Sequence, residues 1–595
     1  MKSVARSEHR WLLACLGLYG LTLCLLGHWL HPVAMPGGEY DLYVERAESL
    51  LAGTLTNDAF HGMLFPELVA LTTLALGNAF AAGRVVTHAA AIAVLYVLYR
   101  WIRQHHGPRP AVWTCVLLAV NAQFVLLSLQ ACSDMTATAF LAAAAWLGCR
   151  YSSHRHVVAA AGLCLGLALA TRPSSMPLAP LFLAVVAANA GRGIGLRAFA
   201  GATFGLGLFV GWLPHAIPTW LQFGSPFANE SWRVLDSKLC HFDVQILVTP
   251  RYEGMLDLLT HEFGALLRLF VQDFWRLWTE VLGAWLAGGC MVRAFAVSTT
   301  ALALAACLWH LWRRQHLPIL SFVLLHTLLI AFTFVPGEGM LLPIVPWVLA
   351  LVVIAGFACA RRWPLAVHAL AAVYATTLAG MAPATLAEFA RQHPTAEIAA
   401  AERVQQEHGA TVTLISTYAA MQRHVSARVW TVSPPLPATY STATMWQIIS
   451  KTANEVGADY FLTSTASFWY ALPDLAAQAP AGHTVRRLDD GVLLVQLPRL
   501  QRDWLQRAEV TRAADGNSID CYLALVEMPD LLGVGFTVFA PDGTSQLLAL
   551  PSTGPREYRA TLPTPPTGGR WRFVPACMLR DGRVLRGTAI ELALP

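Results

Sequence analysis

Residues 11–30 read WLLACLGLYGLTLCLLGHWL, an apolar run that follows the basic residues Lys2, Arg6 and Arg10. An α-helix of about 20 apolar residues is long enough to span the hydrocarbon core of a bilayer. No clear small-residue cleavage site follows the run, which argues against a signal peptide. We therefore predict a first transmembrane helix, and the basic residues before it place its N-terminus in the cytoplasm.

The composition of the whole chain agrees with a membrane protein. Of its 595 residues, 56% are hydrophobic and 13% are charged, and the charged share is about half that of an ordinary soluble domain. These values exclude a disordered chain and a single soluble globule. The net charge of +5 comes from small basic clusters between apolar runs, with no nucleic-acid-binding motif. We expect no nucleic-acid partner.

Ten further apolar runs bring the predicted number of transmembrane helices to about eleven. These runs centre near residues 82–99, 111–130, 135–149, 157–171, 175–190, 199–218, 294–312, 317–335, 341–360 and 364–381. Basic clusters on the side of the N-terminus are Arg100/Arg103/Arg109, Arg150/Arg155, Arg192/Arg197, Arg313/Arg314 and Arg361/Arg362. An odd number of spans then places the C-terminal region outside. We predict a multi-pass protein of the bacterial inner membrane with a periplasmic C-terminal region.

The distribution of acids marks the end of the membrane region. Residues 1–390 hold 18 Asp and Glu, and the shorter remainder holds another 18. We predict a transmembrane domain over 1–390 and a small α/β domain over 391–498. In the latter, helical patterns at 397–408 and 445–456 alternate with strand patterns at 411–415, 459–463 and 492–497. Short β-rich runs separated by turns predict a β-sandwich over 499–595. Cys521 and Cys577 in this last domain could form a disulfide.

Placing an acidic side chain in or beside a membrane costs free energy, so each such residue is a candidate functional residue. Asp134 is the only acid between residues 68 and 229. The first predicted outer loop, residues 31–80, holds several others. Residues 37–43 of that loop read GGEYDLY, where a Gly-Gly turn presents the carboxylates of Glu39 and Asp41. One of them could act as a general base towards a hydroxyl group, or both could merely cap the helix that follows.

Two arginines are candidate ligands of a phosphate group. Arg172 lies in the sequence TRPS on the predicted outer side, where a guanidinium can bind phosphate through paired hydrogen bonds. Arg84 is a weaker candidate of the same kind. The alternative for both residues is that they anchor their helices at the membrane interface.

Metal sites have little support in the sequence. His28, His31 and His61 lie near the first outer loop but have no ligand spacing. Glu39 and Asp41 could hold a divalent cation together with a donor phosphate. A divalent metal ion is therefore the one cofactor that the sequence leaves as an alternative.

A series of short motifs follows a characteristic order between residue 1 and about residue 500. The series is Tyr43, Ala47, Leu50-Leu51 and Gly53, then Phe65-Pro66, Ser133-Asp134-Met135, residues 166–173 (GLALATRP), 223–226 (FGSP) and 342–346 (LPIVP). In this series the chain resembles the GT-C superfamily of polytopic glycosyltransferases. It is most similar to bacterial relatives of protein O-mannosyltransferases and of the aminoarabinose transferase that modifies lipid A. The chain departs from the family at Met340-Leu341, where Arg-Tyr is frequent, and in the extra region 500–595.

The resemblance implies a polyprenyl-phosphate-linked sugar as donor, bound at the outer face of the membrane. It also implies that an acid of the first outer loop is the base. The family acid often lies four residues before the loop tyrosine, here Tyr43, which indicates Glu39. Asp41 is the only Asp in the immediate motif, and we favour Asp41.

We therefore predict an integral-membrane glycosyltransferase that moves a sugar from this donor to a hydroxyl of a lipid, glycan or protein acceptor in the envelope. Arg172, with Arg84, would stabilise the leaving phosphate, and Asp134 would orient the first outer loop or the acceptor. One alternative is a transporter or flippase of lipid-linked glycans, which would be expected to carry acids near mid-membrane. The other is a non-catalytic envelope scaffold, for which the outer-loop carboxylates would be dispensable.

Overall fold

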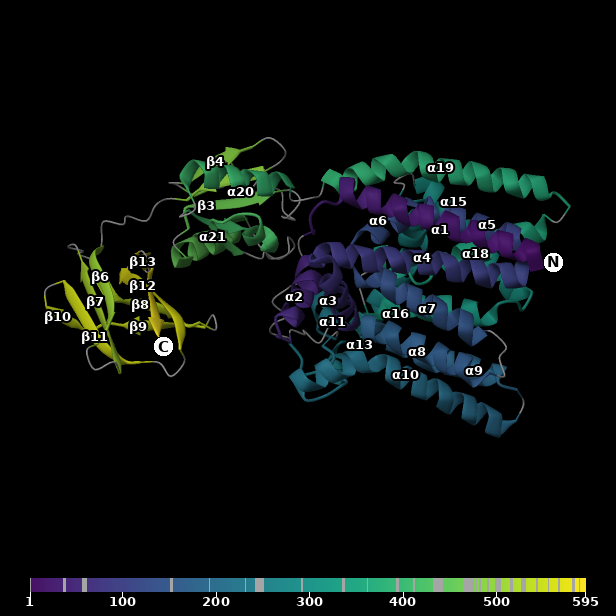
Figure 1. The fold of residues 1–595 in the computed structure, drawn as a ribbon, viewed down its shortest axis with the longest axis horizontal. Helices are drawn as coiled ribbons and strands as arrows, with labels where there is room; N and C mark the ends of the chain where they lie inside the picture. The colour runs from purple at the N-terminus through teal and green to yellow at the C-terminus, as the bar shows by residue number, and fades with distance from the viewer. Residues whose placement is uncertain are drawn as a thin grey trace. The chain divides into compact units, whose positions relative to one another are not determined.

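The computed structural model divides the chain into two compact units, Met1–His393 and Pro394–Pro595, which are described separately (Figure 1). The structure describes residues 2–35, 39–55, 61–149, 154–191, 193–230, 232–240, 251–289, 293–333, 338–360, 362–391, 395–409, 412–431, 442–456, 458–464, 476–477, 479–480, 483–488, 492–497, 505–513, 517–525, 531–541, 544–554, 556–564, 568–579, 584–587 and 589–594.

The first unit is helical throughout its described residues. Its helices are α1 (Lys2–Leu30), α2 (Glu45–Leu51), α3 (Leu64–Leu76), α4 (Ala79–His106), α5 (Pro108–Ala119), α6 (Ala122–Leu129), α7 (Ser133–Cys149), α8 (Arg155–Thr171), α9 (Ala179–Asn189), α10 (Ile194–Phe223), α11 (Trp232–Leu239), α13 (Met255–Arg276), α14 (Leu282–Leu286), α15 (Arg293–Trp312), α16 (Leu317–Thr333), α17 (Glu338–Leu341), α18 (Val345–Cys359) and α19 (Pro364–Arg391). Three short turns of π or 3₁₀ helix are η1 (Tyr40–Val44), η2 (Pro173–Leu178) and η3 (Leu277–Val281).

Each of the eleven predicted apolar runs coincides with a helix or a pair of helices. Within the described residues, five helices are long and apolar enough to cross a membrane, or six if α5 and α6, which meet at 65°, form one span. Of five shorter apolar segments, four coincide with predicted runs, and the fifth, α3, lies in the first predicted outer loop. The run at 135–149 corresponds to α7, which is in neither group. The fold class is therefore as predicted, whereas length and composition do not establish a count of eleven.

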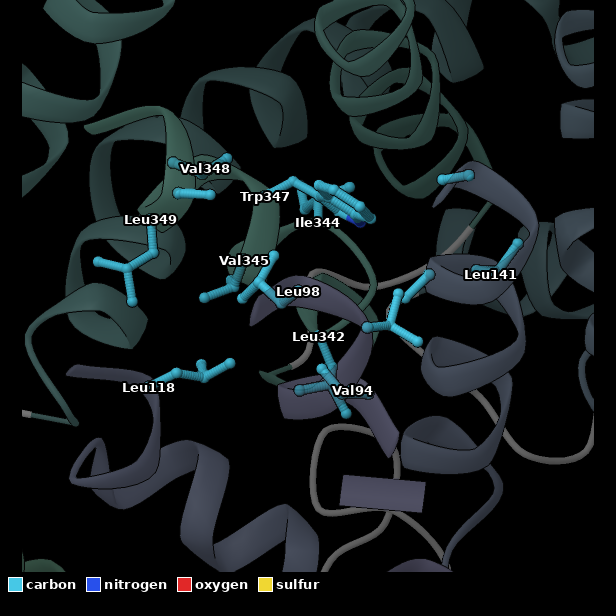
Figure 2. Packing of buried hydrophobic residues seen from close by; sticks show 14 of the residues in the cluster. Val94, Leu98, Leu118, Leu141, Leu342, Ile344, Val345, Trp347, Val348 and Leu349 are labelled. Atoms are coloured by element: carbon cyan, nitrogen blue, oxygen red, sulfur yellow. The ribbon is translucent and has the colours of Figure 1, made fainter. Parts of the chain in front are cut away.

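Helix α18 forms the centre of the first unit. It is apolar around its whole circumference, and most of its residues from Val345 to Ala355 are buried. Figure 2 shows Trp347 and Val345 of this helix close to Leu98 of α4, with Leu118 of α5 and Leu141 of α7 around them. A helix that is apolar on every side is expected in a core of this kind. Helix α18 contacts α15, α5, α4, α14, α16 and α19. Elsewhere in the unit α1 contacts α4, α4 contacts α7, and α8 contacts α10.

The two ends of the helical unit differ in their polar residues. At one end, the His106 ring at the end of α4 lies 4.8 Å from the His316 ring before α16. This contact brings together two of the predicted basic loops, at 100–109 and 313–314. The opposite end holds the first loop and the turn between α6 and α7. This arrangement agrees with the predicted topology, although the side of the membrane that each end faces stays a prediction.

The second unit begins with an α/β region. Its helices and strands are α20 (Thr395–His408), β1 (Thr413–Ser416), η4 (Ala419–Arg423), β2 (Arg428–Thr431), α21 (Thr442–Val456), β3 (Tyr460–Ser464), β4 (Thr484–Arg487) and β5 (Val492–Gln496). The strand order is β2-β1-β3-β5-β4, where β2, β1 and β3 are parallel and β5 is antiparallel to its neighbours. Two helices and three strands lie where the sequence pattern predicts them.

Two antiparallel sheets follow. Their strands are β6 (Leu505–Arg512), β7 (Ser518–Leu525), β8 (Leu531–Phe539), β9 (Ser545–Ala549), β10 (Ser552–Gly554), β11 (Glu557–Pro563), β12 (Gly569–Leu579), β13 (Val584–Arg586) and β14 (Ile590–Leu594). One sheet has the order β10-β11-β7-β6, and the other has β13-β12-β8-β9 with β14 beside β12. Cys521 of β7 and Cys577 of β12 are both buried in the shared core, and in the described part of this region they are not joined by the disulfide considered from the sequence. Both pack there as small apolar side chains.

Candidate functional site

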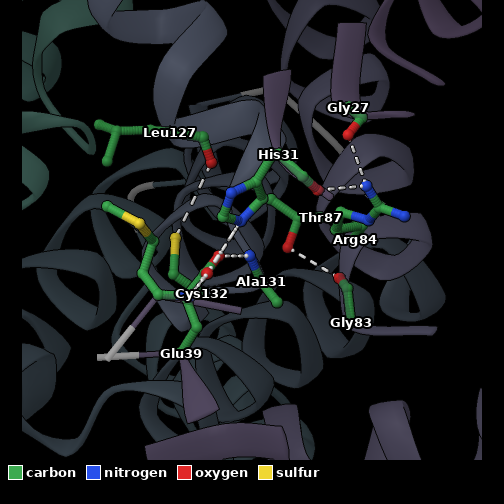
Figure 3. A network of polar contacts seen from close by, with 10 residues as sticks. Gly27, His31, Glu39, Gly83, Arg84, Thr87, Leu127, Ala131 and Cys132 are labelled. Atoms are coloured by element: carbon green, nitrogen blue, oxygen red, sulfur yellow. Dashed lines mark hydrogen bonds and ion pairs between the residues drawn. The ribbon is translucent and has the colours of Figure 1, made fainter. Parts of the chain in front are cut away.

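Glu39 is buried, with 4% of its surface exposed, and its carboxylate is surrounded by donors. Its Oε1 accepts a hydrogen bond from the backbone N–H of Ala131, and its Oε2 accepts one from the N–H of Met35 at 2.8 Å. The Nε2 of His31 lies 2.9 Å from Oε1 and 2.8 Å from Oε2. Figure 3 shows this carboxylate between His31 and Ala131. Glu39 therefore ties the end of α1 to the turn between α6 and α7.

Arg84 of α4 stabilises the same region from the other side of His31. Its Nη1 donates to the carbonyl oxygens of Gly27 at 2.7 Å and His31 at 2.8 Å. Its guanidinium also lies 4.7 Å from the centre of the Phe80 ring. The last carbonyls of a helix lack partners within the helix, and Arg84 supplies one at the end of α1. A role for Arg84 in phosphate binding stays a prediction, and the structure shows this Nη1 already engaged.

Asp41 lies in η1, one residue after its start, and its side chain is outside the described part of the structure. Two residues further on, the Tyr43 hydroxyl lies 2.8 Å from Ser133 Oγ, and its ring meets that of Phe65 edge-on. Helix α2 has no side-chain N-cap, since Val44 occupies that position. The alternative in which Glu39 caps α2 therefore does not hold, because its carboxylate binds elsewhere.

Asp134 and Arg172 form an ion pair, although 38 residues separate them in the sequence. Asp134 lies in the first turn of α7, and Arg172 is the residue that ends α8. Their side chains are 20% and 18% exposed, so the pair is largely shielded from solvent. A Cβ atom at Gly339 would collide with Asp134 Oδ2, so the turn at α17 also packs against this pair. Three separate segments converge on one carboxylate and one guanidinium.

The position of Arg172 depends on close packing between α8 and α10. Gly162 and Gly166 of α8 face Gly207 and Gly211 of α10, and a Cβ at any of the four would collide with the backbone of the other helix. Small residues four apart let two helices in a membrane approach at backbone distance.

The loop before α3 packs against the end of α8 in the same way. A Cβ at Gly62 would collide with the backbone of Ala170 and Thr171. Glycines therefore hold the end of α8, and with it Arg172, beside the first loop.

The sequence analysis missed His326, which belongs to the same region. His326 lies in α16 and is 7% exposed. Its Nε2 lies 3.2 Å from the carbonyl oxygen of Met340, the residue after Gly339. Arg172 is near enough to act electrostatically on its ring. A signal was present, because His326 is the only ionisable residue in the 17 residues of α16.

Glu67 of α3 is another acid of the first loop region. Helix α3 has 13 residues, too few to span a bilayer, so this acid lies outside the spanning segments. Burial raises the pKa of its carboxyl to about 7. Burial of a carboxyl group away from water disfavours its charged form.

A divalent metal at Glu39 does not fit the described residues. Both oxygens of that carboxylate face N–H donors or an imidazole nitrogen. Within the part of the chain that the structure describes, no group of three or more His, Cys, Asp or Glu is arranged to hold a metal ion.

Comparisons with known proteins identify the fold. The sequence model of a family described as dolichyl-phosphate-mannose-protein mannosyltransferase matches residues 61–217, which include both Asp134 and Arg172. The crystal structure of ArnT from Cupriavidus metallidurans in the apo state matches with a TM-score of 0.51 and 14% identity, over 83% of this chain and 98% of that one. This chain has the GT-C fold. The predicted resemblance to the GT-C superfamily is confirmed.

Two further GT-C structures match with lower scores. ArnT from Cupriavidus metallidurans bound to undecaprenyl phosphate has a TM-score of 0.48 and 13% identity, over 82% of this chain and 98% of that one. The Archaeoglobus fulgidus oligosaccharyltransferase in complex with Zn and sulfate has a TM-score of 0.46 and 11% identity, over 98% of both chains. A search of curated proteins found no match. The GT-C assignment therefore rests on the family match and the apo structure.

Proposed function

We propose that this chain is a membrane glycosyltransferase that transfers a sugar from a polyprenyl-phosphate donor to a hydroxyl group of an envelope acceptor. The observation that carries the proposal is the shielded Asp134–Arg172 pair, which lies beside the first loop within a GT-C fold. The matching family is named for the use of dolichyl-phosphate mannose, and the match includes both residues of the pair. A lipid-linked phosphate therefore suits the described chemistry.

Arg172 is the residue that we assign to the donor phosphate. In a site with little water, a guanidinium stabilises a developing phosphate charge far more than it would in bulk solvent. Asp134 holds Arg172 in place before the donor binds, because the two form an ion pair. On binding, the phosphate and the Asp134 carboxylate share the guanidinium, which has five N–H donors.

The reaction forms one C–O bond and breaks another. The acceptor oxygen attacks the anomeric carbon, and the bond from that carbon to the phosphate oxygen breaks. The hydroxyl proton passes to a carboxylate of the first loop, and polyprenyl phosphate leaves with the electron pair of the broken bond. A carboxylate that takes this proton must lie within hydrogen-bond reach of the hydroxyl and keep a free lone pair.

We assign the base role to Asp41 and a positioning role to Glu39. Three donors already bind the Glu39 carboxylate, so a proton placed there would disrupt bonds that hold α1 to the turn between α6 and α7. Asp41 lies two residues away, in the turn that also carries Tyr43. The hydroxyl of Tyr43, near the end of this turn, contacts Ser133, the residue before Asp134, and this contact stabilises the turn.

We further propose that the site faces the periplasm. Two of the basic loops, at 100–109 and 313–314, meet at the opposite end of the helical unit, and such loops stay in the cytoplasm. Nucleotide sugars are not available on the outer side, which agrees with a lipid-linked donor. Lipid, glycan and protein acceptors all present the hydroxyl group that the reaction requires.

The test uses the full-length protein in closed proteoliposomes, a radiolabelled polyprenyl-phosphate sugar and an envelope extract. We expect label to move to an acceptor with wild type, and not with Asp41→Asn. Glu45→Gln is the matched control, because Glu45 is an exposed acid of the same segment. Transfer that survives both Asp41→Asn and Glu39→Gln would refute the mechanism. Donor that crosses the bilayer without transfer would indicate a flippase, and donor that stays unbound would indicate a scaffold.

A further inference from the structure

The imidazole of His326 has two nitrogens in different settings. Nε2 lies 3.2 Å from the carbonyl oxygen of Met340. A carbonyl oxygen only accepts hydrogen bonds, so Nε2 carries the hydrogen in this contact. In the neutral ring, Nδ1 is then an acceptor with a lone pair. The structure therefore fixes both the tautomer and the chemical character of the second nitrogen.

Nδ1 is buried and has no hydrogen-bond partner among the residues that the structure describes. Buried polar atoms in native proteins are nearly always paired, and an unpaired one costs about 1–3 kcal/mol. The ring contacts Phe322, one turn earlier in α16, which offers it no polar group. A bound molecule that donates a hydrogen bond would remove this cost.

His326 is linked to the Asp134–Arg172 pair through a continuous set of contacts. Met340, which accepts the bond from His326, follows Gly339 in α17, and Gly339 packs directly against Asp134. The charge of Arg172 also reaches the His326 ring. The free lone pair therefore lies in the region that we assign to the donor, and not at a distant part of the helical unit.

We propose that His326 Nδ1 is a hydroxyl-binding subsite, which accepts a hydrogen bond from a hydroxyl group of a sugar bound beside Arg172. The phosphodiester of a polyprenyl-phosphate sugar is anionic and has no hydrogen to donate, whereas every hexose or pentose carries several hydroxyl groups. Arg172 then binds the phosphate, and His326 orients a sugar. This inference rests on the proposed function, and it adds a residue and a ligand group to that site.

Two substitutions separate the two nitrogens. His326→Gln places an amide N–H near the position of Nε2, so the bond to Met340 is kept and the acceptor at Nδ1 is lost. His326→Asn places an amide oxygen near the position of Nδ1, so the acceptor is kept and the bond to Met340 is lost. If His326 has only a structural role, His326→Asn should destabilise the protein more than His326→Gln, because it loses the bond to Met340. The proposed role predicts that Gln is the more harmful change for sugar binding.

The probes are undecaprenyl phosphate and undecaprenyl-phosphate mannose, tested for binding to full-length protein in nanodiscs. We expect His326→Gln to bind undecaprenyl phosphate like wild type and the mannosyl lipid about 10-fold more weakly, the effect of one lost hydrogen bond. His326→Asn should bind the mannosyl lipid more tightly than His326→Gln, although its melting temperature should be lower.

A second measurement distinguishes the source of the hydroxyl. If donor binding is unchanged in His326→Gln, but more envelope extract is needed for half-maximal transfer, then the hydroxyl belongs to the acceptor. If neither quantity changes while wild type transfers sugar, the inference about His326 is overturned and the proposed function stands. If wild type binds neither lipid, both fail.

Discussion

Two polar clusters lie near the same end of the helical unit, and they differ in how completely their hydrogen-bonding groups are paired. Around Glu39, each carboxylate oxygen faces a donor from His31 or from a backbone N–H. Around Arg172, one carboxylate, one guanidinium and a buried imidazole nitrogen retain capacity for a ligand. A fully paired network fixes geometry, whereas a partly paired one gains energy when a ligand completes it. The difference assigns stability to the first cluster and binding to the second.

Substitution of Glu39 should have the largest effect, and the effect should be on folding. Glu39→Leu leaves His31, Met35 and Ala131 with unpaired donors, each at a cost of about 1–3 kcal/mol. We expect loss of most folded protein, measured as monodisperse yield and melting temperature in detergent. Glu45→Leu, at an exposed position, should fold normally. A Glu39→Leu protein with the wild-type melting temperature would remove the distinction between the clusters.

Substitution of Arg172 should act mainly on activity. Arg172→Gln removes the positive charge that we assign to the leaving phosphate, and loss of such a group lowers rates by about 100- to 1,000-fold. The double variant Arg172→Gln/Asp134→Asn removes the unpaired carboxylate as well, so it should be more stable than Arg172→Gln and equally inactive. The measurements are the transfer rate and the melting temperature. Recovery of activity in the double variant would contradict the assignment.

Substitution of a glycine at the contact between α8 and α10 should affect the Arg172 cluster indirectly. Gly166→Ala brings a Cβ into the backbone of α10, and overpacking of this kind costs about 1–3 kcal/mol. We expect lower transfer and a lower melting temperature, because the end of α8 carries Arg172. Gly205→Ala, on α10 with open space around its Cβ, should leave both unchanged or raise stability slightly. Equal effects of the two substitutions would show that close packing does not position Arg172.

The smallest effect concerns Glu67, whose pKa is raised to about 7 by burial. The folded protein then keeps this proton at pH values where the unfolded chain has lost it. The contribution of Glu67 to stability is therefore present at low pH and is lost as pH rises from about 4.5 to about 7. Glu67→Gln should gain stability relative to wild type over this range, followed as melting temperature against pH. A difference that does not change with pH would show that folding leaves the pKa of Glu67 unchanged.

The sequence predicted the helices well because apolar runs are long and clearly bounded. All eleven runs coincide with helices, and the alternation of patterns after residue 391 predicted α20, α21 and three strands. The candidates Asp134 and Arg172 also came from the sequence, because an ionisable residue stands out in an apolar stretch. Strands β2 and β4 were missed; both are edge strands of the sheet, and β4 is mostly exposed, so it lacks the apolar run of a buried strand.

Which polar residues meet could not be read from the sequence. The contact of Glu39 with the N–H of Ala131 joins residues 92 apart, and no local pattern marks a backbone donor as the partner. His31 was considered as a metal ligand and not as the partner of Glu39. In α16, both lipid-facing and protein-facing positions are apolar, so the pattern does not show which side of the helix His326 occupies.

The sequence by itself indicated that this chain is a multi-pass membrane protein, carries a C-terminal β-rich region and resembles GT-C enzymes. Those properties follow from hydrophobicity and from short motifs, which are local. The tertiary structure decided that the buried Glu39 joins the end of α1 to the turn between α6 and α7. It also decided that Asp134 pairs with Arg172 and that His326 lies beside them. Those properties depend on how closely helices approach, and glycines such as Gly166 and Gly339 set that distance through the side chains they lack.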